Sequence, residues 1–113
     1  MAAVYVSNLV INTCATFKQT FTLEDSGSNS PLNLSGYTVR SHMRKHPGAS
    51  TFTDLNAAIL NVNDGTVTVG LTTSQCTVMK PGRYVYDVLI TDSSNTTTSV
   101  VEGSVLVRKG VTQ

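Results

Sequence analysis

Residues 80–92 read Lys80-Pro81-Gly82-Arg83-Tyr84-Val85-Tyr86-Asp87-Val88-Leu89-Ile90-Thr91-Asp92. A proline-glycine turn leads into an alternating run, which is typical of a β-strand. A polar break at residues 93–95 ends the run, and a second run rich in β-branched residues extends from Thr96 to Lys109. We therefore predict a β-hairpin at the centre of a sheet. The side chains expected to meet on one face of this hairpin are Tyr84, Tyr86, Val88 and Ile90 with Val101, Gly103, Val105 and Val107.

The segment before residue 32 has the pattern of two further strands. Apolar residues favour strands over residues 8–11 and 15–24, with a break near Thr13-Cys14. In the second of these strands the odd-numbered side chains share one face, which we expect to point into the core. These side chains are Ala15, Phe17, Phe21 and Leu23. Residues 25–31 are rich in Ser, Asn and Gly and predict a flexible turn rather than a domain linker.

The middle of the chain continues the pattern of short strands. Residues 32–37 predict a corner that leads into a strand from Tyr37 to His46, with one apolar and one basic face. The triplet Asn63-Asp64-Gly65 predicts a tight hairpin turn, because Asp-Gly readily supplies positive φ angles. A strand over residues 66–71 then pairs back, and residues 72–79 favour a short helical turn.

Together these segments predict an all-β protein of about seven strands. Helical periodicity is almost absent, and 113 residues suffice for one domain with its own core. We expect a single immunoglobulin-like antiparallel β-sandwich over residues 1–113, with short polar terminal arms before Asn8 and at residues 109–113. The residues on which we expect the core to depend are Phe17, Phe21, Leu34, Tyr37, Val69, Tyr84, Tyr86, Val88 and Val105.

The composition argues against several classes of partner. Only 13% of residues are charged, and the net charge is +1, so no global field attracts nucleic acid or an anionic membrane. A weakly charged surface also promotes self-association, which suits a subunit packed among others. The first residues carry no basic export signal and no apolar run reaches membrane-spanning length. We expect synthesis in a reducing cytoplasm, where Cys14 and Cys76 are free thiols.

No arrangement of residues predicts an enzyme, a cofactor or a metal centre. His42 and His46 share one face of their strand but lie about 13 Å apart, which is too far for one metal ion. No GxSxG motif or metal-binding cysteine spacing occurs. Asp87 interrupts an apolar strand. We interpret it as an outward carboxylate pairing with Arg83, Arg108 or a donor on another strand, in preference to a ligand site. We expect catalytic, cofactor-binding and metal-binding residues to be absent.

One basic cluster stands out in this nearly neutral chain. It consists of Arg40, Arg44, Lys45 and His46. Without interleaved aromatic residues the cluster is a poor nucleic-acid site. It is interpreted as a solvated strand face, with contact to an acidic patch on a partner or to a phosphate as the functional alternative.

Several motifs, taken in order, resemble small virion proteins of tailed bacteriophages. The motifs are residues 5–11, Leu34-Ser35-Gly36-Tyr37, Arg44-Lys45, residues 82–88 and residues 101–105. The chain looks most like such proteins of cyanobacterial myophages, which are similar to the immunoglobulin-like N-terminal domain of baseplate upper proteins. It departs from the pattern at Thr13-Cys14-Ala15, where related chains often carry a glycine. The resemblance implies a virion assembly module without catalytic residues.

Three functions follow as hypotheses. The leading one is a non-enzymatic virion protein, made in the host cytoplasm, that docks in symmetric copies onto tail, baseplate or capsid proteins. The baseplate or tail is slightly favoured over capsid decoration, and strand addition at a sheet edge is the expected mechanism. The alternative is a host-surface carbohydrate- or receptor-binding module, which the absence of Trp weakens. The third, a small hydrolase or metal enzyme, needs His42 or His46 to meet a carboxylate in a pocket.

Overall fold

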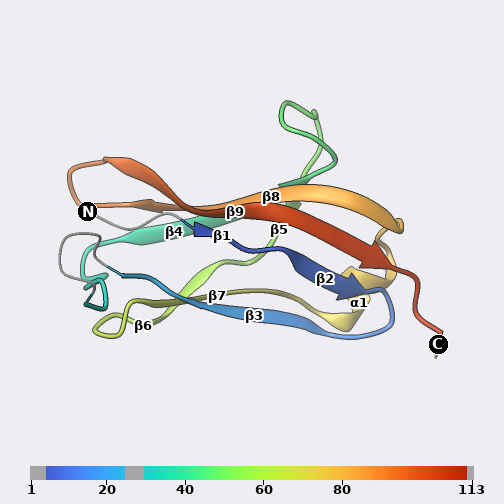
Figure 1. Ribbon diagram of the computed structural model, residues 1–113, viewed down its shortest axis with the longest axis horizontal. Helices are drawn as coiled ribbons and strands as arrows, with labels where there is room; N and C mark the ends of the chain where they lie inside the picture. The colour runs from blue at the N-terminus through green and yellow to red at the C-terminus, as the bar shows by residue number, and fades with distance from the viewer. Residues whose placement is uncertain (1–4, 25–29, 112–113) are drawn as a thin grey trace.

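Two β-sheets pack face to face in the computed structural model, which describes residues 5–24 and 30–111 (Figure 1). The described residues form nine strands and one short helix. These are β1 (Tyr5–Val6), β2 (Leu9–Asn12), β3 (Phe17–Thr22), β4 (Thr38–Arg44), β5 (Thr53–Asp54), β6 (Ala58–Asn61), β7 (Thr66–Leu71), α1 (Thr73–Thr77), β8 (Gly82–Thr91) and β9 (Thr97–Arg108). The prediction of an all-β sandwich is confirmed.

The larger sheet is built around the predicted hairpin. Its strand order is β1-β9-β8-β4-β5, with β2 also paired to β9, so that β8 lies between β9 and β4. Tyr86 lies opposite Gly103, and Val88 lies opposite Val101. Tyr84 lies opposite Val105, so these three residues of β8 meet the predicted face of β9, whereas Ile90 lies opposite Thr98. The turn between β8 and β9 is closed by the Asp92 side chain, which accepts hydrogen bonds of 2.9 Å from the amides of Ser94 and Thr96.

The first two strands join the larger sheet by running parallel to its last strand. Leu9 lies beside Val105, and Ile11 lies beside Val107. Both β2 side chains are buried, because alternate residues of β2 point towards the smaller sheet. Residues 5 and 6 form β1 and also pair with β9. Residues 5 and 6 of the predicted N-terminal arm are therefore paired within the larger sheet, and residues 1–4 lie outside the described part of the chain.

The smaller sheet has the strand order β3-β7-β6 and forms the lower layer in Figure 1. Its hairpin turn is the predicted one, with Gly65 at φ +67°. An added Cβ at Gly65 would lie 2.6 Å from the carbonyl oxygen of Leu23, so a side chain is excluded there by space as well as by conformation. After β7, the short helical turn predicted for residues 72–79 is present as α1, which begins with a capping box between Thr72 and Gln75.

The core lies between the two sheets, and both contribute to it. Phe21 of β3 and Tyr86 of β8 stack across the layers with ring centroids 6.5 Å apart. Seven of the nine predicted core residues are buried, whereas Tyr37 and Tyr84 are only partly buried and pack against the others. Ala15 is exposed, contrary to prediction. The reason is that residues 12–15 form a turn, closed by a 3.1 Å hydrogen bond from the Ala15 amide to the Asn12 carbonyl, before β3 begins.

In the part of the chain that the structure describes, no helix has the length and apolarity needed to cross a lipid bilayer.

Candidate interaction surface

The loop between β4 and β5 is the most prominent projection from the sandwich (Figure 1). It begins after Arg44, where Pro47-Gly48 ends the strand two residues earlier than the sequence predicts. The Arg44 guanidinium donates a 2.7 Å hydrogen bond to the carbonyl oxygen of Ala49 and lies 4.8 Å from the centre of the Phe52 ring. The Phe52 ring in turn stacks on His42, with centroids 4.1 Å apart. The loop is therefore held to the sheet at both ends.

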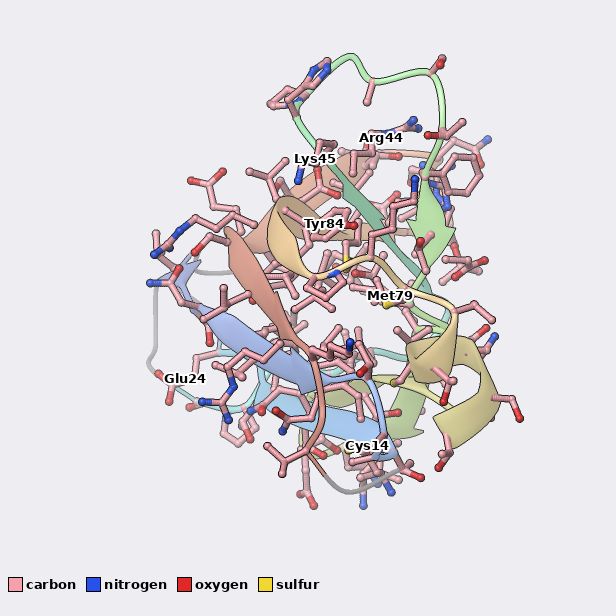
Figure 2. The ribbon with its side chains drawn as sticks, turned by 90° about the vertical axis from the view of Figure 1, so that its right-hand side faces the viewer. Cys14, Glu24, Arg44, Lys45, Met79 and Tyr84 are labelled. Carbon is pink, nitrogen blue, oxygen red and sulfur yellow. The ribbon has the colours of Figure 1, made fainter. Side chains whose placement is uncertain are left out.

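The structure separates the four residues of the predicted basic cluster. Arg44 and Lys45 lie together at the end of the sandwich where β8 begins, close to Tyr84 (Figure 2). Arg40 is exposed and lies four residues earlier on β4, about 13 Å away at the usual strand rise. His46 is exposed in the loop, where its Nδ1 lies 3.0 Å from the Pro47 carbonyl oxygen. The cluster therefore reduces to Arg44 and Lys45.

Lys45 is positioned by two neighbours that are distant in sequence. Its Nζ lies 4.9 Å from the centre of the Tyr84 ring, a cation–π arrangement. An added Cβ at Gly82 would lie 2.9 Å from the same Nζ, so the missing side chain of Gly82 leaves room for the ammonium. The Tyr84 hydroxyl donates a 2.8 Å hydrogen bond to the Lys80 carbonyl, which fixes the ring. The ammonium group of Lys45 is therefore held in one position at this end of the molecule.

Asp87 lies half-buried on the outer face of the larger sheet, which agrees with the prediction of an outward carboxylate. Its neighbours in register are His42 on β4 and Glu102 on β9, rather than Arg83 or Arg108. These residues border a shallow hollow of about 630 Å³ beneath Pro47 and Gly48. His42 is thus the donor-bearing side chain nearest in register to Asp87.

The two histidines do not converge on a common site. His42 stacks under Phe52, whereas His46 lies beyond the strand in the exposed loop. Among residues 5–24 and 30–111, no group of three or more His, Cys, Asp or Glu side chains is placed to hold a metal ion.

The two cysteines are free thiols in different environments. Cys76 is fully buried in α1, and burial raises the pKa of its thiol, an effect partly opposed by a backbone hydrogen bond from Phe17. Cys14 is partly exposed in the turn after β2, close to Gly110. The amide of Gly110 donates a 3.0 Å hydrogen bond to the Thr13 hydroxyl. The start of the predicted C-terminal arm is therefore attached to this turn, and residues 112–113 lie outside the described part of the chain.

The smaller sheet presents an apolar edge. Strand β6 pairs with β7 on one side, and among the described residues no strand pairs with its other side. Leu60 on this strand is 61% exposed, and Val62 just beyond it is 39% exposed. An open edge strand with exposed apolar side chains is a template for pairing with another chain. This edge and the end of the sandwich around Lys45 are the two features that fit an interaction role.

Sequence reasoning missed three contributors to these surfaces. Phe52 lies in a segment that looks merely apolar in patches, and Lys80 precedes a turn. Leu60 resembles any other strand residue until the sheet order places β6 at an edge. The available signal for Phe52 was its isolation as the only aromatic residue between Tyr37 and Tyr84.

No family model and no curated protein matches the chain.

Proposed function

We propose that this chain is a non-enzymatic structural protein of a tailed bacteriophage virion, docking in multiple copies onto tail, baseplate or capsid proteins. The observation that carries the proposal is the open edge of β6 with its exposed Leu60 and Val62. Strand addition at such an edge gives affinity through main-chain hydrogen bonds and specificity through side-chain pockets. The sequence resemblance supplies the virion setting, with the baseplate or tail slightly favoured over capsid decoration.

We further infer that the sandwich is immunoglobulin-like. The strand orders β3-β7-β6 and β9-β8-β4 are compatible with the orders B-E-D and G-F-C of such domains, which supports this inference. The Tyr84 hydroxyl bonds to the backbone four residues upstream near the start of β8, as in the tyrosine corner of such domains. An experimental structure in which the described strands pair in another order would contradict this inference.

The virion assignment is tested by immunogold labelling of intact particles of the source virus with antibody raised to this chain. Label at the tail end supports a baseplate module, and label over the head supports a capsid decoration protein. Absence of the chain from purified particles would overturn the proposal.

The docking edge is tested by substituting Leu60→Lys and measuring incorporation into particles. A lysine at the edge opposes pairing with another strand, so incorporation should fall at least about fivefold. Thr22→Lys, on the exposed face of β3, is the matched control and should leave incorporation unchanged. Equal incorporation of both variants would exclude β6 as the docking edge.

A second candidate function is recognition of a host-surface carbohydrate or receptor. Phe52, which is 51% exposed in the projecting loop, favours it because exposed aromatic rings can pack against sugar rings. Binding of the chain to a glycan array that is lost in Phe52→Ala would support this function. The absence of any glycan signal from the intact chain would count against the carbohydrate form of this function.

A further inference from the structure

A second hollow lies at the end of the sandwich, between the β4–β5 loop, α1 and the start of β8. It has a volume of about 460 Å³ and adjoins the shallow hollow beside Asp87, with Arg44 lining both. Apolar atoms of Met43, Met79 and Tyr84 contribute to its lining. Figure 2 looks at this end of the molecule, with Tyr84 between Lys45 and Met79. The hollow therefore offers an apolar surface large enough for a side chain.

Cationic side chains surround this apolar surface. Arg44, Lys45 and Lys80 contribute three positive charges and Asp54 contributes one negative charge, so the net formal charge of the lining is +2. The whole chain has a net charge of only +1. Three of the eight Lys and Arg residues but only one of the seven Asp and Glu residues line this hollow, so the rest of the chain carries a net formal charge of −1. Such a lining attracts a negatively charged partner and suppresses a positively charged one.

Two of the three cations are held in place before any partner arrives. Lys45 lies over the Tyr84 ring in the space left by Gly82, and Arg44 lies over Phe52 and bonds to Ala49. Their neighbours in the described structure are aromatic faces and a carbonyl oxygen. A carboxylate of a partner would therefore accept charge-assisted hydrogen bonds from Arg44 and Lys45. These side chains are already held in place, so they lose little further conformational entropy on binding.

We propose that this hollow binds an acidic peptide segment of another particle protein. An apolar side chain of the segment lies against Met79 and Tyr84, and its flanking carboxylates lie against Lys45 and Lys80. The apolar lining favours a peptide over a small inorganic anion, which would leave that surface unused. This proposal rests on the proposed assembly function only in assigning the peptide to another particle protein. The binding chemistry itself is argued from the residues of this chain.

The test is an NMR titration of the full ¹⁵N-labelled chain with the probe acetyl-Asp-Glu-Leu-Glu-Asp-amide. Shifts should concentrate at the amides of Lys45, Gly82 and Tyr84. The neutral probe acetyl-Asn-Gln-Leu-Gln-Asn-amide should bind at least about tenfold more weakly, and raising the salt concentration should weaken binding of the acidic probe. The double variant Lys45→Gln/Lys80→Gln should bind the acidic probe at least about fivefold more weakly. The matched control Lys18→Gln, on the exposed face of β3, should bind it unchanged.

Equal binding of the neutral and acidic probes, or unchanged affinity in the double variant, would overturn the proposal. A third probe, acetyl-Asp-Glu-Gly-Glu-Asp-amide, tests the apolar contact and should bind more weakly than the leucine probe. If the glycine probe and inorganic phosphate bind as well as the leucine probe, the hollow is a small-anion site and the peptide assignment is wrong. A failed peptide titration would overturn the peptide site but not the virion assignment, which the immunogold labelling tests. Absence of the chain from particles would overturn the virion assignment but not a peptide site found by titration.

Discussion

The hydroxyl of Tyr86 donates a 2.6 Å hydrogen bond to the carbonyl oxygen of Ser7, 79 residues away in the chain. Ser7 lies between β1 and β2, and its own amide bonds to the carbonyl of Glu102 on β9. The Tyr86 ring is buried and stacks on Phe21 of the opposite sheet. One side chain in the middle of β8 thus contacts the other layer and also holds the segment that carries the first two strands.

Replacing Tyr86 should separate these two contributions. Tyr86→Phe removes the hydrogen bond but keeps the ring, so the free energy of unfolding should fall by about 1–2 kcal/mol. Tyr86→Ala also removes a buried ring, and the loss should be about 3–5 kcal/mol. Urea denaturation followed by circular dichroism measures both values. Tyr37→Phe is the control, since the Tyr37 hydroxyl makes no hydrogen bond among the described residues, and it should change stability by less than about 0.5 kcal/mol. Equal losses in Tyr86→Phe and Tyr37→Phe would show that the bond to Ser7 contributes nothing.

Gly103 should not tolerate a side chain. It lies opposite Tyr86, and an added Cβ would collide with the carbonyl oxygen of Ser7. Gly103→Ala should therefore displace the segment between β1 and β2 and speed hydrogen exchange at the Ser7 amide. We expect a destabilisation of about 1–3 kcal/mol. Gly48→Ala is the control. Its φ of +87° makes alanine strained by about 1 kcal/mol, but its added Cβ meets nothing within 4 Å. Exchange at Ser7 should be unchanged in that variant, and an equal increase in both would refute the steric explanation.

The two thiols should react at very different rates. Cys14 is partly exposed, whereas Cys76 is fully buried. Iodoacetamide added to the native chain should modify Cys14 alone, and Cys76 should react only when urea unfolds the chain. Mass spectrometry of tryptic fragments measures each site. Rapid native modification of Cys76 would mean that α1 opens far more readily than its packing implies.

Stability should decrease at alkaline pH because burial raises the pKa of the Cys76 thiol. Above the ordinary thiol pKa of about 8.5, the unfolded chain loses the proton while the folded chain keeps it. The folded state then binds more protons, so stability is fully present below about pH 8.5 and falls as pH rises. Burial likewise raises the pKa of Tyr86, which extends the loss above about pH 10. Thermal unfolding of Cys76→Ala between about pH 8 and 10 should show a smaller slope with pH than the parent. Cys14→Ala, which keeps the buried thiol, should retain the full slope.

The cap of α1 should contribute measurably to stability. The Thr72 hydroxyl accepts a 3.2 Å hydrogen bond from the Gln75 amide, and the Gln75 side chain accepts one of 2.9 Å from the Thr72 amide. Thr72→Ala removes the first bond and should cost about 1 kcal/mol. Thr96→Ala, in an exposed turn, is the control and should stay within about 0.5 kcal/mol of the parent in the same denaturation experiment. A Thr72→Ala variant as stable as that control would contradict the capping role.

Local patterns predicted those parts of the fold in which neighbouring residues supply the information. The alternation from Tyr84 to Ile90 and the Asp64-Gly65 turn depend only on strand period and turn geometry, and both are confirmed. The burial of Val100 next to the predicted inward-facing Val101 was not predictable in this way. Both are buried, which a regular strand forbids, because the register of β9 against β8 shifts between Val88 and Leu89. The parallel pairing of β2 with β9 likewise depends on residues nearly a hundred positions apart.

The candidate surfaces likewise combine features that the sequence predicts with features that only the tertiary structure reveals. The sequence by itself determined that the chain is an all-β protein with little charge, because composition and the two-residue period are local properties. It also placed Arg44 and Lys45 next to each other. Only the tertiary structure placed Lys45 over Tyr84, left room for it at Gly82 and put Leu60 on an open edge. These relationships join segments distant in sequence. They depend on strand order and on the course of the β4–β5 loop, which no short window of sequence specifies.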